Sequence, residues 1–406
     1  MTLPVETGSI AIWNYEVTRR LARSCEVIVY AKRDRGQKKV EWDQRVQYRR
    51  FPITQDLWCQ RVARRLPMGF VKRVGEFHSV WYCLGFILRV SIDLRKQRCD
   101  VIHVHNFSQF VPVIRAFNRT SKIVLHMHCE WLTEIKRETV SRRLRKVDRL
   151  VGCSSYVAET IRQGFPEYGN VCRAIQNGVD IGHFRPKDAV ARSEENGEKT
   201  ILFVGRVSPE KGVHVLLDAF QLVLERYPQT WLQIAGPLGA APREFVVANS
   251  HDPKVVELDR FYEGDYVAGL KDSLPPTVAA RVSFTGLLHY LEMVEHYRGA
   301  DILVCPSVWN EPFGLPVVEA MACGIPVVGT RSGGIQEIVK NEETGLLVER
   351  GSVRELADAV LSLLGDASRR ESMGKAGRAR AIELFSWDRV ARELDELYGS
   401  LAEVTL

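Results

Sequence analysis

The sequence predicts an α/β fold of two doubly wound domains in tandem. Short apolar runs rich in Val and Ile alternate with longer helical patterns along the whole chain, as is typical of parallel sheets covered by helices on both faces. The series occurs twice, and a polar, unpatterned stretch at residues 185–198 lies between the two copies. The length of 406 residues also fits two domains better than one.

The expected strands follow in order along each half. In the first half they are 26–31, 46–53, 101–105, 123–128, 150–154 and 171–176. In the second half they are 201–205, 231–235, 282–286, 302–306, 325–329 and 345–348. Residues 237–281 form an insertion of mixed charge, where we expect loop and helix. The predicted domains are therefore 1–184 and 199–385, joined by a linker at 185–198 and followed by a closing segment at 386–406.

Composition and cysteine usage indicate a globular, cytoplasmic protein. Hydrophobic residues make up 45% and charged residues 26% of the chain. No apolar run approaches the ~20 residues that span a bilayer, and the N-terminus shows no secretory signal. The nine cysteines lack any Cys-x-x-Cys spacing, so free thiols in a reducing compartment are expected and a zinc site is not.

Charge is divided unevenly between the halves. Residues 1–198 hold 35 Lys+Arg and 21 Asp+Glu, a net +14, whereas residues 199–406 hold 21 and 29, a net −8. The uneven charge suggests different partners for the two halves. The basic residues are dispersed and match no nucleic-acid-binding motif, so no nucleic-acid partner is expected.

One basic segment, residues 58–74, interleaves large apolar residues with cations and holds no acid. Its cations are Arg61, Arg64, Arg65, Lys72 and Arg73. Such a segment can lie in a headgroup layer, and we expect the first domain to bind an anionic surface, either a membrane or an anionic or lipid-linked acceptor. A helix packed on the sheet, with a solvated basic face, is the alternative.

The strongest chemical signal is the motif Glu311-Pro-Phe-Gly-Leu-Pro-Val-Val-Glu319, directly after an expected strand. Ligands of parallel sheets bind where strands end and helices begin. A helix is expected to start near Gly314 and Leu315, whose amides then suit a phosphate group. Glu319 falls inside an apolar helix, where a buried carboxylate needs hydrogen-bond donors. A ribose diol can supply them, and an Arg or backbone partner is the structural alternative.

Two further strand–loop–helix junctions in the second half favour anions. In the first, Gly205 allows a tight turn while Arg206 and Lys211 can neutralise phosphate oxygens; a solvated basic loop is the alternative. The second, Ser332-Gly333-Gly334, is weaker by itself. The chain contains no Asp-x-Asp pair to hold a divalent ion on a diphosphate, so no metal and no cofactor are expected.

These motifs resemble those of the retaining glycosyltransferases of family 4, and the resemblance extends over nearly the whole chain. The family has two Rossmann-like domains facing a cleft, the GT-B architecture. The resemblance implies that Arg206 and Lys211 hold the donor diphosphate and that Glu319 holds the ribose. It implies that Glu311 contacts the donor sugar, aided by amides at Phe313 and Gly314, while backbone near Leu287 meets the base. It also implies that the closing helix crosses back to the first domain.

The first domain resembles the family more loosely. His128, at the end of the run Ile123–His128, matches a histidine that reaches the donor, although His126/His128 and His103/His105 also alternate as core or surface pairs do. A metal role for such pairs is not expected. Gly8 lies in a stretch resembling the family's donor-covering loop, but the strand that precedes this loop in the family is missing. We expect the upstream coding sequence to encode an apolar strand of about 5–8 residues.

The sequence therefore predicts a metal-independent, retaining transferase that moves a sugar from a nucleotide diphosphate donor to an unidentified acceptor. Such an enzyme fits a role in cell-envelope polysaccharide synthesis on the inner face of the membrane. Two alternatives remain open: a GT-B epimerase or phosphorylase, and a non-catalytic relic that binds nucleotide-sugars.

Overall fold

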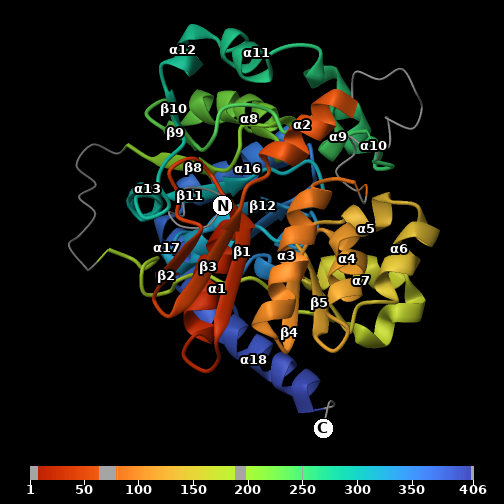
Figure 1. Ribbon diagram of the computed structural model, residues 1–406. Helices are drawn as coiled ribbons and strands as arrows, with labels where there is room; N and C mark the ends of the chain where they lie inside the picture. Colours follow the sequence, from red (N-terminus) through yellow and green to blue (C-terminus); the bar gives the residue numbers. More distant parts are fainter. Residues whose placement is uncertain (1–7, 64–78, 80, 188–197, 249, 404–406) are drawn as a thin grey trace. The chain divides into compact units, whose positions relative to one another are not determined.

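The computed structural model describes residues 8–63, 79, 81–187, 198–248 and 250–403. The chain divides into two compact units (Figure 1): unit 1 comprises Met1–Gln176 and Trp387–Leu406, and unit 2 comprises Asn177–Ser386. Each unit combines parallel strands with helices, which confirms the predicted α/β class. The basic segment at 58–74 lies mostly outside the described residues.

Unit 1 contains two separate sheets. Strands β1, β3 and β2 form the first in that order, and β4, β5, β6 and β7 form the second. The strands are β1 (Val27–Lys32), β2 (Val40–Asp43), β3 (Val46–Phe51), β4 (Val101–His105), β5 (Lys122–Met127), β6 (Arg149–Gly152) and β7 (Cys172–Ala174). All neighbours pair in parallel except β2, which is antiparallel to β3 and which the sequence analysis missed.

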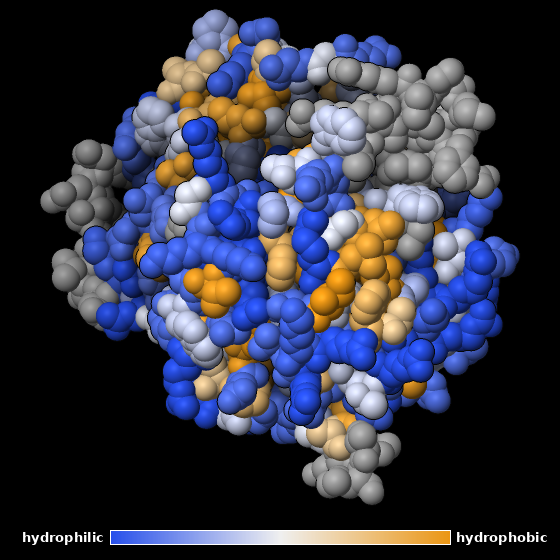
Figure 2. All heavy atoms as spheres, viewed as in Figure 1, coloured by the Kyte–Doolittle hydropathy of each residue, from blue (hydrophilic) through white to orange (hydrophobic). Residues whose placement is uncertain are grey.

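Helices of unit 1 come from both ends of the chain. They are α1 (Ser9–Leu21), α2 (Thr54–Ala63), α3 (Leu84–Gln97), α4 (Val111–Phe117), α5 (Trp131–Glu134), α6 (Arg137–Leu144), α7 (Ser155–Gly164) and α18 (Trp387–Glu403), with 3-10 turns η1 (Ser108–Phe110) and η2 (Pro166–Val171). The last helix, α18, packs against α1 and β4. Figure 2 shows a mostly hydrophilic face with hydrophobic side chains over α3, where Ile92 is exposed while Ile87, Val90 and Leu94 are buried.

Unit 2 is a single six-stranded parallel sheet. Its order is β10-β9-β8-β11-β12-β13, which in sequence terms is 3-2-1-4-5-6, the arrangement of dinucleotide-binding folds. The strands are β8 (Thr200–Val204), β9 (Trp231–Ala235), β10 (Val282–Gly286), β11 (Ile302–Cys305), β12 (Val327–Thr330) and β13 (Gly345–Val348). The strand order reverses between β8 and β11, which pair in parallel, so ligands are expected at the carboxyl ends of these two strands.

Ten helices cover this sheet in the described part of unit 2. They are α8 (Val213–Arg226), α9 (Arg243–Val246), α10 (Pro253–Val256), α11 (Tyr266–Asp272), α12 (Pro276–Ala279), α13 (Met293–Gly299), α14 (Leu315–Ala322), α15 (Ile335–Ile338), α16 (Val353–Leu364) and α17 (Ala367–Leu384), with 3-10 turns η3 (Pro209–Lys211) and η4 (Glu257–Tyr262). The expected insertion at 237–281 thus holds short helices joined by loops. Residues 177–184 belong to unit 2, where the amide of Val179 donates to the Phe385 carbonyl at 2.6 Å.

Candidate functional site

The loops that follow β8 and β11 lie against one another in unit 2. Gly212, which begins α8, has φ of +73°, and a Cβ there would lie 2.0 Å from the carbonyl oxygen of Pro306. Only glycine tolerates both the left-handed backbone and this close approach. The amide of Val308 donates to the carbonyl of Glu210 at 2.9 Å. These contacts hold Lys211 of one loop beside Glu311 of the other.

Lys211 and Glu311 form an ion pair at the end of the two central strands. The ammonium nitrogen Nζ lies 2.9 Å from Oε1 and 2.7 Å from Oε2 of the carboxylate. Oε2 also accepts hydrogen bonds from the Trp309 indole at 3.0 Å and from the Ser307 hydroxyl at 3.1 Å. The Lys211 Nζ lies 4.8 Å from the centre of the Trp309 ring, within cation–π range. The pair is mostly buried, with side chains 22% and 13% exposed.

This arrangement keeps both groups charged. Burial opposes ionisation of Glu311, but the Lys211 charge and the hydrogen bonds from Lys211, Trp309 and Ser307 outweigh it and lower the pKa of the carboxyl. Burial likewise disfavours the ammonium, yet the charges of Glu311 and Glu210 raise the pKa of Lys211. Glu311 is therefore a carboxylate at neutral pH, so it can accept hydrogen bonds and cannot serve as an acid.

Helix α14 begins directly after this pair. Gly314 caps it with φ of 110°, so the amides of Phe313, Gly314 and Leu315 precede or open the first turn, where amides have no partner within the helix. The Gly333-Gly334 turn, which follows β12, packs against the loop that contains Glu311. A Cβ on Gly333 would approach the Glu311 carbonyl oxygen to 2.3 Å. This third junction therefore closes against the backbone of the Glu311 loop.

Glu319, one turn into α14, is buried and bonded to one side chain that the sequence analysis did not identify. The hydroxyl of Tyr297, on α13, donates to its Oε2 at 2.6 Å. Burial raises the pKa of Glu319 to about 7, although the Tyr297 hydrogen bond lowers it. The structural alternative named an Arg or backbone partner, and the side chain that holds Glu319 is a tyrosine. Glu319 thus sits near its protonation midpoint at neutral pH, ready to respond to added donors.

Arg206 and Leu287 lie at the same edge of the sheet but, unlike the residues above, are exposed. Arg206 follows β8 and is exposed, with no ion pair to any residue that the structure describes. Leu287 follows β10 and is 56% exposed. Among the residues predicted for unit 2, the structure thus joins Lys211 to Glu311 directly and leaves Arg206 free for a ligand.

Two of the predicted site residues, Gly8 and His128, belong to unit 1. Gly8 is exposed and precedes α1 with φ of 96°; residues 1–7 ahead of it lie outside the described part. His128 is buried, its amide donates to Oδ1 of Asn106 at 2.6 Å, and its Nε2 lies 2.9 Å from Nδ1 of His105. Burial and neighbouring His105 lower the pKa of His128 well below its ordinary value, so the ring is neutral.

Sequence reasoning missed the partners that orient the acidic residues. Trp309 lies two residues before Glu311, and this proximity in sequence could have suggested the contact. Tyr297 lies 22 residues before Glu319, and no sequence pattern links the two. No described helix has the length and hydropathy needed to span a bilayer.

Comparisons of the sequence with known proteins identify the family. The profile of "Glycosyl transferases group 1" matches residues 184–380, and that of "Glycosyltransferase Family 4" matches residues 10–183. A D-inositol 3-phosphate glycosyltransferase from Geodermatophilus obscurus is 33% identical over 336 residues, which cover 78% of this chain and 70% of the relative.

Solved structures show the same architecture. A sucrose-phosphate synthase from Thermosynechococcus elongatus superposes with a TM-score of 0.73 and 25% identity, covering 98% of this chain and 94% of its own. The Anabaena HepE protein in complex with UDP and glucose gives a TM-score of 0.67 at 19% identity, with coverage of 97% and 98%. The sequence matches and the parallel sheets together show that the chain belongs to the group 1, family 4 glycosyltransferases and has their GT-B fold.

Proposed function

We propose that this glycosyltransferase moves a sugar from a nucleotide diphosphate donor to an acceptor hydroxyl, with retention of anomeric configuration and without a metal ion. The observation that carries the proposal is the Lys211–Glu311 pair at the point where the strand order of unit 2 reverses, between β8 and β11. The structure of HepE with UDP and glucose, a protein of the same fold, supports a nucleotide-sugar as donor.

The diphosphate is the leaving group, and its charge must be neutralised as it departs. Arg206 is exposed and free of described ion pairs, Lys211 is a charged ammonium, and the first amides of α14 add partial positive charge. Together these groups can stabilise the developing anion. Their presence on one sheet edge supports a reaction without a divalent ion, which the family resemblance also implies.

Glu311 and Glu319 then divide the recognition of the donor. Glu311, kept ionised by Lys211, accepts hydrogen bonds from sugar hydroxyls and places the reacting carbon. Glu319, whose pKa is near 7, accepts from the ribose hydroxyls. Backbone near Leu287 meets the base. For unit 1, family membership supports a contact between His128 and the donor and a donor-covering role for the loop at Gly8.

Retention requires the acceptor oxygen to form its bond to the sugar on the face that the diphosphate leaves. The bond between the anomeric carbon and the diphosphate oxygen breaks, and its electron pair leaves with the diphosphate. The acceptor hydroxyl bonds to the same carbon, and its proton passes to the departing oxygen, which is the nearest base. Glu311 remains ionised throughout, as its contacts favour.

The decisive experiment measures nucleotide release from a panel of nucleotide-sugars, with and without candidate acceptors, followed by NMR of the product's anomeric centre. We expect one donor to be consumed and the product to keep its configuration. An inverted product would contradict retention. Formation of sugar 1-phosphate from an oligosaccharide and inorganic phosphate would contradict the transferase and favour a phosphorylase. No turnover together with tight nucleotide-sugar binding would indicate a non-catalytic protein.

We further propose that the acceptor is anionic or lipid-linked and that the protein works at the inner face of the membrane, in cell-envelope polysaccharide synthesis. The net +14 of residues 1–198 and the acid-free segment at 58–74 support this. Each cation near an anionic surface contributes about 1 kcal/mol to binding.

A further inference from the structure

Four histidines gather on one face of the second sheet of unit 1. His103 and His105 come from β4, while His126 and His128 come from β5 and its end, and the two strands pair in parallel with His105 opposite His126. Neighbouring ring centroids lie 4.2–5.7 Å apart. Trp13 of α1 packs against all four rings at 4.7–6.0 Å.

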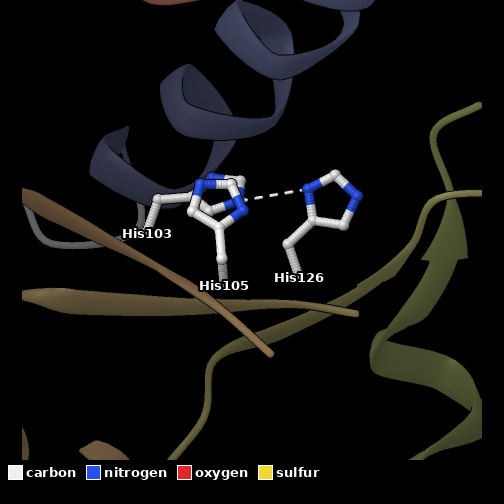
Figure 3. A group of neighbouring side chains, drawn as sticks. All are labelled: His103, His105 and His126. Atoms are coloured by element: carbon white, nitrogen blue, oxygen red, sulfur yellow. Dashed lines mark hydrogen bonds between the residues drawn. The ribbon is translucent and has the colours of Figure 1, made fainter. Parts of the chain in front are cut away.

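Three of these histidines have the spacing of metal ligands. One ring nitrogen each from His103, His105 and His126 lie within 4.8 Å of one another. Figure 3 shows the three side chains on the same side of their strands. Nε2 of His103 and Nδ1 of His126 are 3.2 Å apart, close to the roughly 3.3 Å that separates two nitrogens bound tetrahedrally to zinc at about 2.0–2.1 Å.

The hydrogen bonds within the cluster leave it incompletely satisfied. Nε2 of His126 and Nδ1 of His128 are buried and have no hydrogen-bond partner among the residues that the structure describes, which is costly for polar atoms. A hydrophobic core at this position would avoid that cost, so imidazoles are a poor choice for packing alone.

The groups that hydrogen-bond to these histidines also resemble those around known metal sites. Metal-bound histidines usually hydrogen-bond through their other ring nitrogen. Nδ1 of His103 is bonded to the Tyr398 hydroxyl on α18, and Nδ1 of His105 is bonded to Nε2 of His128. These contacts leave Nε2 of His103 and of His105 for the ion, together with Nδ1 of His126, whose Nε2 has no partner among the described residues.

We propose that His103, His105 and His126 bind one divalent transition-metal ion of the zinc class, which fastens β4 to β5 beneath α1 and α18. Imidazole ligands suit zinc, copper and nickel better than magnesium or calcium. This ion is structural and belongs to unit 1, whereas the charged groups assigned to the diphosphate belong to unit 2. The cysteine spacing could not predict this site, because its ligands are histidines. Two of them alternate on β4, and the third lies on β5, which is separate in sequence.

The test uses the full chain purified without a polyhistidine tag. After incubation with zinc and dialysis, elemental analysis should give one zinc per chain, and zinc should raise the melting temperature. The double variant His103→Gln/His126→Gln should lose both effects. The control His251→Gln/His289→Gln removes two exposed histidines of unit 2 and should keep both. Equal zinc binding by the double variant and the wild type overturns the proposal.

A second measurement does not depend on the variants folding. X-ray absorption of the zinc-loaded wild type should show nitrogen ligands at about 2.0–2.1 Å, whereas sulfur ligands lie at about 2.3 Å. A sulfur shell would assign the ion to cysteines and overturn the proposal, as would substoichiometric zinc after dialysis. Near-ultraviolet circular dichroism of the single variant His105→Asn confirms folding, and this variant should bind zinc more weakly.

Discussion

The Tyr297 hydroxyl donates a hydrogen bond of 2.6 Å to Oε2 of Glu319 in the interior of unit 2. This carboxyl has a pKa of about 7 because burial penalises its charge. Ribose hydroxyls, if they bind as proposed, would favour the ionised form. Nucleotide binding should then release a proton near neutral pH, and affinity should rise between pH 6 and pH 8.

Calorimetry in buffers of different ionisation enthalpy measures this proton release. In Tyr297→Phe the lost hydrogen bond should raise the pKa of Glu319 further and weaken nucleotide binding at pH 7, while Glu319→Gln should abolish the release. Identical binding enthalpies in all buffers for the wild type would refute the assignment of Glu319 to the ribose.

The same carboxyl should make stability depend on pH. Its folded-state pKa lies above the ordinary 4.5, so the native state holds a proton that the unfolded chain has released between about pH 4.5 and 7. Its contribution to the free energy of unfolding is therefore present at low pH and lost as pH rises through that window, by on the order of 3 kcal/mol at most. Urea titrations should show the wild type losing stability relative to Glu319→Gln from pH 5 to pH 7.5. A difference in stability between the two proteins that stays constant with pH would contradict the raised pKa of Glu319.

Lys211 should matter for both affinity and turnover. Lys211→Ala removes a charge from the diphosphate site, and the loss of a charge-assisted hydrogen bond of about 1.5–3 kcal/mol corresponds to roughly 10- to 150-fold weaker donor binding. It also leaves Glu311 buried without its cation, so the pKa of Glu311 rises and the acidic limb of the kcat profile moves to higher pH. Donor titration and pH–rate profiles measure the two effects. Unchanged affinity in both Lys211→Ala and Glu319→Ala would remove the site assignment.

Glu311 and Trp309 should affect turnover more than binding. Glu311→Ala should mainly lower kcat, and Trp309→Phe keeps the ring but removes the indole donor to Oε2. We expect about a tenfold loss of kcat in Trp309→Phe, consistent with a hydrogen bond to a charged group, and little change in donor KM. The exposed Trp231, changed to Phe, is the matched control. A loss confined to KM would show that Trp309 acts on binding instead.

Turnover should survive excess EDTA in short assays, because Arg206, Lys211 and the α14 amides neutralise the diphosphate. Loss of activity that magnesium or manganese restores would refute the metal-free transfer. Loss that only zinc restores would point instead to the buried histidine site of unit 1, so the two ideas fail separately.

Liposome co-sedimentation tests the anionic surface. Binding should require anionic lipid, fall with salt, and fall when Arg61, Arg64, Arg65, Lys72 and Arg73 are neutralised. The control neutralises five exposed cations elsewhere in unit 1: Arg95, Lys96, Arg98, Arg119 and Arg145. Equal loss in both variants would show that net charge, and not the segment at 58–74, governs binding.

Most of the strands and site loops of unit 2 could be predicted from the sequence, because the strands are continuous apolar runs and the loops have charged residues at the strand ends. It anticipated where α14 begins and that the insertion at 237–281 contains loop and helix, but it did not place these helices. It missed the antiparallel β2, a short strand whose burial alternates between exposed and intermediate and which therefore lacks an apolar signature. It also missed Tyr297 and the four-histidine cluster, because both arise when separate elements meet in the folded chain.

Gly333 and Gly334 leave no room for variation beside Glu311, since a Cβ on Gly334 would lie 2.8 Å from the Cα of Phe313. A library aimed at new donor sugars would waste its diversity at these two positions, because nearly every substitution displaces the loop that it is meant to tune. The side chains of Leu287 and Leu291 are more than half exposed, and randomisation there leaves the backbone undisturbed. If the residues after β10 contact the donor as proposed, donor choice is open to engineering at the end of β10 and closed at the end of β12.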